Sequence, residues 1–276
     1  ALPFPRTIMY LFSIFLLELL AKQREDYMQE QQSNAPQNSM MSKLVNIFTS
    51  PSEAFEGISS SPGKASAWLF PFLAIFAISV LITYLLVTNE TLKAQIVDAQ
   101  AKSLQKAVES GRMTQQLADQ QIEGMQNMGP GMFIAFGTIG SLVYICVYFF
   151  GSALFLWLAG KFGLKASAGY GKYLEVYGMS SWVGLLGALI TTLLIVGMNT
   201  MYASPSAALA VLSDYDPTND MHKYMSAANA FSIWQAAVLG IGLSKLSGKG
   251  TGAGMGVAFG LWLVWVVISV SLGIAR

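Results

Sequence analysis

The stretch from Ala67 to Val87, AWLFPFLAIFAISVLITYLLV, decides the fold class because it carries no charged side chain. The hydrocarbon core of a bilayer is about 30 Å thick, so a membrane-spanning helix needs roughly 20 mostly apolar residues. Only helices and closed barrels satisfy their own backbone hydrogen bonds inside lipid. Barrel strands alternate apolar and polar residues, whereas this run does not. The stretch therefore predicts a membrane-spanning helix.

Four further stretches of the same kind follow along the chain. They are residues 132–160, 174–198, 227–246 and 252–273. The composition agrees with them, because 54% of the 276 residues are apolar and 11% are charged, against about 25% charged in soluble domains. The mean hydropathy is +0.50. We expect an all-α, polytopic membrane helical bundle of five transmembrane helices within residues 67–274.

Charge and cysteine content exclude several classes of protein. The net charge is +1, so no global field attracts nucleic acid, and we expect no nucleic-acid partner. The single cysteine, Cys146, excludes an internal disulfide framework and a cysteine-based zinc site. His222 is the only histidine, and it lies in a polar segment where a solvated side chain is expected. We expect no metal, no cofactor and no catalytic residue, and hence no enzyme.

The lysines predict which way the chain faces, because short cytoplasmic loops are rich in Lys and Arg. The loop between the second and third stretches holds three lysines and no acid, and the junction between the fourth and fifth holds two. The loop between the third and fourth holds three aspartates and one lysine. The N-terminus is therefore predicted to be cytoplasmic. Residues 88–131 become an extracytoplasmic helical loop, interpreted as a cap or as a recognition element.

The N-terminal region divides into two parts. Residues 1–40 are interpreted as an extension or linker. The apolar run Thr7–Ala21 leaves open a signal-like or anchoring role. Residues 41–66 are predicted to form a cytoplasmic amphipathic segment, with a helix that starts near Ser50-Pro51. Two readings of this segment stay open, an anchor in the membrane interface and a docking helix for a partner. The apolar residues assigned to it are Ile47, Phe48 and Phe55.

Small residues predict close helix packing. Gly252, Gly256 and Gly260 are spaced by four, so they share one helix face and permit close approach in lipid. Gly184 and Gly240 offer matching small faces in the third and fourth stretches.

Polar residues inside apolar stretches are the candidate functional residues. Glu175 is an ionisable group at the edge of a span, which is a functional-site candidate or a side chain that reaches the interface. Asn229 and Gln235 lie in the fourth stretch, where they are either hydrogen-bonding contacts between helices or part of a polar cavity. Apart from the third stretch, which contains Glu175, the predicted spans carry no carboxylate between their ends. This disfavours a proton-coupled transporter.

Two short segments resemble a known family. They are Val45–Phe55, VNIFTSPSEAF, with Pro62, Trp68 and Pro71 after it, and Tyr177–Ser180, YGMS. Together with the five-span layout they resemble the Yip-domain family of integral membrane proteins, in its bacterial branch. The resemblance implies residence in a bacterial inner membrane with no assigned reaction, and it adds Tyr177 to the candidate polar residues. The Asp-Leu-x-Gly-Pro segment of eukaryotic members is not found here, so small-GTPase binding is not carried over.

The sequence thus predicts a non-enzymatic multi-pass membrane protein of Yip type. We expect it to bind other membrane proteins or a second copy of itself, or to organise lipid of the bilayer. The alternative is a small-solute or lipid transporter or channel. That alternative gains support if Glu175, Asn229, Ser232 and Gln235 converge on one cavity, and loses it if they lie in dry helix contacts.

Overall fold

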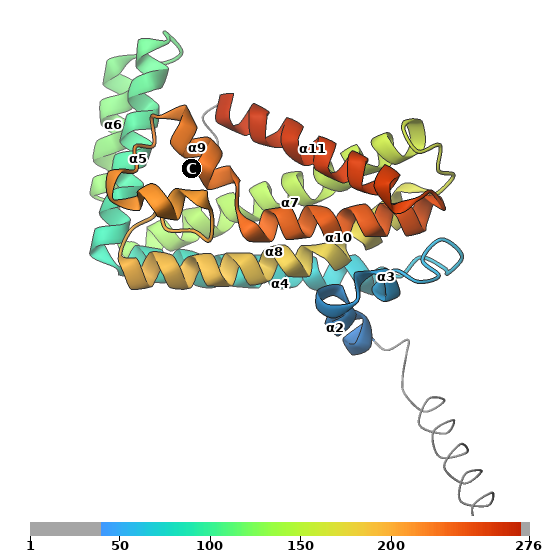
Figure 1. Ribbon diagram of the computed structural model, residues 1–276. Helices are drawn as coiled ribbons and strands as arrows, with labels where there is room; N and C mark the ends of the chain where they lie inside the picture. Colours follow the sequence, from blue (N-terminus) through green and yellow to red (C-terminus); the bar gives the residue numbers. More distant parts are fainter. Residues whose placement is uncertain (1–39, 272–276) are drawn as a thin grey trace, which may run out of the picture. The chain divides into compact units, whose positions relative to one another are not determined.

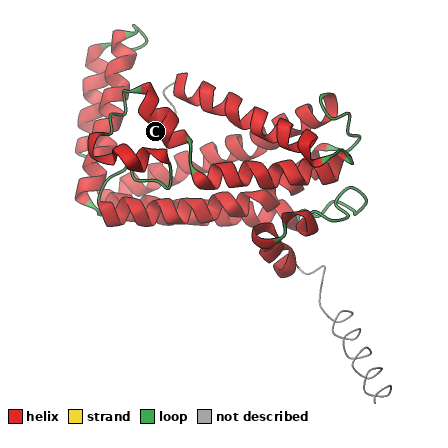
Figure 2. Ribbon diagram, viewed as in Figure 1, coloured by secondary structure: helices red, strands yellow, loops and turns green. Residues whose placement is uncertain are grey.

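The computed structural model describes residues 40–271, and its regular elements in that range are all helices (Figures 1 and 2). The chain divides into two units, Ala1–Lys43 and Leu44–Arg276. Of the first unit, only residues 40–43 are described, and they belong to the start of α2 (Met40–Thr49). The predictions for residues 1–40, including Thr7–Ala21, lie outside the described residues. The contacts below are within the second unit.

Four helices are long and apolar enough to cross a membrane, judged by length and composition. They are α4 (Ser66–Thr88), α7 (Pro130–Phe162), α8 (Tyr170–Met198) and α11 (Thr251–Ser271). A fifth helix, α10 (Ala230–Ser247), packs along α8 and α11. The all-helical membrane fold predicted from the sequence is confirmed at this level.

The remaining elements are short or polar. α3 (Pro51–Ala54) follows α2, and the polar helices α5 (Glu90–Glu109) and α6 (Gln115–Gln126) form the hairpin expected between the first two spans. Asn89 starts α5, because its side-chain oxygen accepts hydrogen bonds from the N–H groups of Thr91 and Leu92 at 3.0 and 3.1 Å. The loop after α8 contains the 3₁₀ helix η1 (Ala207–Asp214) and the helix α9 (Asp220–Ala227).

The start of α10 differs from the sequence expectation. The sequence placed Asn229 inside the predicted span 227–246. Instead, α9 ends at Ala227, and the Asn229 side chain accepts a hydrogen bond from the N–H of Phe231 at 2.9 Å. Asn side chains compete for local backbone N–H groups in this way. Asn229 therefore starts a new helix.

Chain connectivity brings five helix termini to one end of the bundle. These are the starts of α4, α8 and α11 and the ends of α7 and α10, which Figure 1 draws on the right. Gly248 ends α10 in the left-handed conformation (φ +67°), so that α11 returns antiparallel after a very short loop. We call this the lysine-rich end, after Lys64, Lys161, Lys165, Lys172, Lys245 and Lys249.

Candidate functional site

The N-terminal half of α8 is buried on every side. All residues from Tyr173 to Ser181 are buried, including Glu175 and Tyr177. A helix in a bundle usually exposes one face, so burial all round means that neighbours surround it. Those neighbours are α4, α7 and α10, together with the segment around α3. We call residues 173–183 the buried half of α8.

Glycines allow these neighbours to approach closely. A Cβ atom added to Gly178 would lie 2.5 Å from the Cα of Trp68 in α4. One added to Gly242 in α10 would lie 2.6 Å from the Cγ1 of Val176. Real Cβ atoms do not come so near, so any larger residue at either position forces backbone or side chains to shift.

The N-terminal segment is part of the helical bundle. Ile47 and Phe55 are fully buried, and the ring of Phe55 lies over Gly242 beside Val176. Phe48 meets Trp234 edge to face, with ring centroids 5.7 Å apart. The first reading from the sequence placed these three residues in the membrane interface. The structure places Phe48 against Trp234 of α10 and Phe55 against Gly242 of α10, and Ile47 belongs to the same buried cluster. The missing side chain at Gly242 leaves room for the ring of Phe55.

Glu175 connects the loop before α4 to α8. Its Oε1 accepts a hydrogen bond from the backbone N–H of Lys64 at 2.5 Å, and its Oε2 accepts one from Nζ of Lys172 at 2.7 Å. The same Nζ donates to Oγ of Ser61 at 3.3 Å. Glu175 is only 5% exposed, so this is a buried ion pair completed by further hydrogen bonds. Its role in the structure is to position residues 61–64 against α8.

A second ion pair at the same end is exposed. Nζ of Lys245 in α10 lies 2.7 Å from Oε2 of Glu56, whose side chain is 72% exposed. An exposed pair of this kind contributes about 0–1 kcal/mol. This ion pair orients the turn after α3. The buried contacts of Phe55 and Glu175 stabilise its position.

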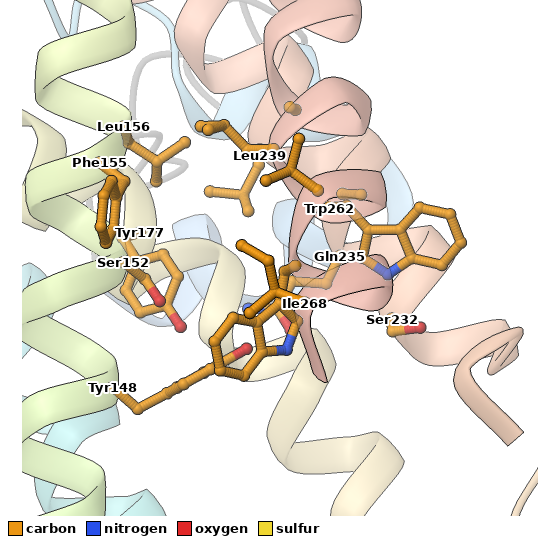
Figure 3. Close-up of a pocket in the computed structure, with 15 residues that line it drawn as sticks. Tyr148, Ser152, Phe155, Leu156, Tyr177, Ser232, Gln235, Leu239, Trp262 and Ile268 are labelled. Carbon is orange, nitrogen blue, oxygen red and sulfur yellow. The ribbon is translucent and has the colours of Figure 1, made fainter. Parts of the chain in front are cut away.

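Two pockets meet inside the bundle. The first, of about 210 Å³, lies among α7, α8, α10 and α11, and Figure 3 shows its lining side chains. The second, of about 360 Å³, lies among α4, α7 and α8. Tyr148, Tyr177 and Gln235 line both. Of the four candidate polar residues, the structure therefore brings Tyr177 and Gln235 together, while Glu175 and Asn229 lie elsewhere.

The candidate packing glycines divide into two groups. Gly184 lies against the Gln235 side chain, and Gly240 lies against Met255. At Gly252, Gly256 and Gly260 an added Cβ would meet nothing within 4 Å. The face of α11 that packs on α10 instead carries Gly254, which lies against Gly240 and Ser244, with buried Ala258 one turn later. Positions two apart on a helix point in nearly opposite directions, so the two faces cannot both meet α10.

The loop at the other end of the bundle has its own polar contacts. The Asp216 carboxylate accepts hydrogen bonds from the Thr218 hydroxyl at 2.7 Å and N–H at 2.8 Å, which lower the pKa of Asp216. Nδ1 of His222 accepts a hydrogen bond from the N–H of Asp216 at 2.9 Å. Burial raises the pKa of Tyr215, whose ring stacks on His222. Among the described residues, no group of three His, Cys, Asp or Glu side chains is placed to hold a metal.

With this geometry in place, comparison with known proteins identifies the family. The family model of the Yip1 domain matches residues 45–273. The chain belongs to the Yip1 domain family. It is also 26% identical over 238 residues to membrane protein YknW of Bacillus subtilis (strain 168), across 84% of this chain and 90% of YknW. No solved structure gives a significant match.

The two segments that carry the family resemblance meet in space. Phe55 closes the first segment, and its ring lies beside Val176, which directly precedes the second segment Tyr177–Ser180. Gly178 of that segment contacts Trp68, which the resemblance also includes. Sequence reasoning missed Gly242 and the three-way contact of Glu175, because their partners Phe55 and Lys64 are distant in the chain, and it missed Gly254 because the packing of α10 on α11 decides its contacts. In this Yip1 domain the buried half of α8 is therefore the centre of the candidate site.

Proposed function

We propose that the chain is a non-enzymatic Yip-type protein with five membrane spans and a cytoplasmic N-terminus in a bacterial inner membrane. It acts by binding membrane partners, or by organising lipid around its spans. Four helices support the span count by length and composition, and α10 adds a fifth because it lies along two of them. The lysine-rich end supports the orientation, since Lys-rich short loops face the cytoplasm.

Single-cysteine labelling tests the orientation. In a Cys146→Ser background, Ser52→Cys and Ser213→Cys each place one thiol at an exposed position, at opposite ends of the bundle. A membrane-impermeant maleimide added to the outside of intact cells is expected to label position 213 and not position 52. Labelling of position 52 alone would reverse the proposed topology.

The observation that carries the partner-binding function is the attachment of residues 50–64 to the bundle at two points. Phe55 anchors this segment in the bundle, and Glu175 binds its far end through Lys64. The exposed residues between these anchors form what we call the α3 surface: Ser52, Glu53, Glu56, Gly57, Ser59 and Ser60. A surface that is ordered before binding loses little conformational entropy when a partner binds. This supports docking of a cytoplasmic or membrane partner at the α3 surface.

The non-enzymatic character is supported by how the ionisable groups are used. The Glu175 carboxylate accepts hydrogen bonds from the Lys172 side chain and from the backbone N–H of Lys64. His222 accepts a backbone hydrogen bond in an outer loop, away from both pockets. General acid–base chemistry needs a group within reach of a bound substrate, and these two groups are committed to structural contacts.

Cross-linking in the native membrane, followed by mass spectrometry, tests the proposed function. Glu53→Lys reverses one charge on the α3 surface without touching Phe55, and Glu123→Lys makes the same change on exposed α6 as a matched control. We expect a stoichiometric protein partner with the unchanged chain and with Glu123→Lys, and its loss with Glu53→Lys. An identical set of cross-linked proteins in all three would contradict docking at the α3 surface.

A transporter or channel is the second candidate, and the two pockets favour it. They share Tyr148, Tyr177 and Gln235 as lining residues. Only part of the polar set expected for a transport path lies there, because Glu175 and Asn229 are engaged elsewhere. Self-cross-links alone, together with a retained lipid or solute, would favour this candidate over partner binding.

A further inference from the structure

The first pocket is built to hold hydrocarbon. Leu156, Leu239 and Leu261 contribute to its walls, and none of the described residues that line it is charged (Figure 3). The leucine-lined part of the pocket does not hold water well, because water needs several polar partners. An apolar chain gains contacts in the same space. The lining therefore favours an apolar occupant over an aqueous one.

The mouth of the pocket lies on faces that meet lipid. Phe155 of α7 and Val264 and Ile268 of α11 line the pocket and are also exposed. Figure 3 shows Phe155 and Ile268 on opposite sides of the pocket. Both helices are apolar enough to cross a membrane, so their exposed side chains contact acyl chains. An occupant therefore enters from the bilayer.

The inner wall of the same pocket is polar. The Tyr177 hydroxyl interacts with the side chains of Ser152 and Tyr148. The Gln235 carboxamide lines both pockets and forms no hydrogen bond within residues 40–271. An amide in hydrocarbon is unfavourable without a hydrogen-bond partner. A hydroxyl or carbonyl oxygen on the occupant would supply one.

The second pocket adds room for such a head group. It adjoins the first at Tyr148, Tyr177 and Gln235 and has a volume of about 360 Å³, and within residues 40–271 no charged side chain lines it. Pockets for small molecules typically measure about 300–1,000 Å³. A charged phospholipid head finds no counter-charge here, whereas an uncharged oxygen-bearing head finds donors from tyrosine and glutamine.

We propose that the two pockets form a binding site for an uncharged lipid with a small oxygen-bearing head, of the long-chain alcohol or quinone class. The apolar chain lies between α7 and α11, and the head oxygen accepts a hydrogen bond from Gln235 or Tyr177. The site rests on the lipid-organising side of the proposed function. It does not depend on the α3 surface, so each can fail without the other.

Photolabelling of the purified full chain tests the site. Three diazirine probes are compared, a long-chain alcohol, a quinone with an apolar tail, and a phosphatidylglycerol with the diazirine on its acyl chain. Labelled peptides are mapped by mass spectrometry. We expect the alcohol, the quinone or both to label pocket residues of α7 and α11, and to outcompete the phospholipid there. Comparing the labelling by the alcohol with that by the quinone shows which oxygen-bearing head group the site prefers.

Three variants sharpen the test. Gln235→Leu removes the polar group at similar size and is expected to lower pocket labelling about tenfold. Val264→Trp narrows the mouth of the pocket. Because Val264 is exposed, this change is expected to lower pocket labelling without disturbing the core. Val147→Trp, on an exposed face of α7 outside both pockets, is the matched control and should change nothing.

Two outcomes would overturn the proposal. One is phospholipid labelling of the pocket as strong as that by the alcohol and the quinone, which would make it an ordinary lipid-facing groove. The other is labelling that stays unchanged in folded Val264→Trp. Neither outcome bears on whether Glu53→Lys loses a protein partner.

Discussion

The two halves of α8 have similar apolar composition but opposite surroundings. Every residue from 173 to 181 is buried, whereas Leu189, Leu193, Val196 and Met198 in the other half are exposed. We call residues 189–198 the open half. The buried half is enclosed because glycines and the N-terminal segment let neighbours approach it, whereas the open half leaves these four apolar side chains exposed. Apolar character alone therefore does not predict which part of a membrane helix is core.

The largest effect is expected where the N-terminal segment reaches the buried half. Phe55→Ala leaves a cavity beside Val176 and should lower the free energy of unfolding by about 3–5 kcal/mol. Leu193→Ala in the open half, where the side chain is 73% exposed, is the matched truncation. It should cost less than about 1 kcal/mol. Unfolding in mixed detergent and SDS measures both, and equal losses would erase the distinction between the halves.

The next effect concerns the buried ion pair. Glu175→Gln keeps an acceptor for the Lys64 N–H but leaves the Lys172 ammonium without its counter-charge, at a cost of about 2–3 kcal/mol. Glu56→Gln, at the exposed pair with Lys245, should cost about 0–1 kcal/mol. The same unfolding measurement compares them. If Glu56→Gln lowers the free energy of unfolding as much as Glu175→Gln does, burial does not determine how much each ion pair contributes.

Gly178 and Gly197 offer a comparison within one helix. Gly178→Ala places a methyl group against the backbone of Trp68 and should lower stability by about 1–3 kcal/mol. Gly197→Ala meets nothing within 4 Å and should be neutral or slightly stabilising, since alanine favours helix. A stabilising Gly178→Ala would show that α4 and α8 are not in close contact.

The smallest effect is expected at Asp216, in the loop between α8 and α10, away from the buried half of α8. The folded pKa of Asp216 is below its ordinary value of 3.8, so its contribution is present above that value and is lost as pH falls through the folded pKa. Because Asp216 is exposed, Thr218→Val should change this contribution only slightly. The pH dependence of unfolding between pH 3 and 5, compared for the two chains, measures it. A steep difference would indicate a buried carboxylate there.

Four of the five predicted spans coincide with helices that are long and apolar enough to cross a membrane, because a nearly charge-free run of about 20 residues has few other uses. The sequence could not choose between the two glycine faces of α11, since Gly252, Gly256 and Gly260 have the same spacing as the face with Gly254 and Ala258. Only the position of α10 decides which face is packed. The roles of Phe55 and Glu175 were also out of reach, because each depends on contacts more than 100 residues away in the chain.

The central claim is that the N-terminal segment is part of the bundle core and exposes one face, the α3 surface, which we propose to be cytoplasmic. Two neighbouring positions test it directly in a Cys146→Ser background, Ser52→Cys on the α3 surface and Ala54→Cys in the core, where Ala54 is 1% exposed. In inside-out membrane vesicles, the account predicts that a maleimide reacts readily at position 52 and at position 54 only after unfolding. Equal reaction at both positions in the native membrane would contradict it.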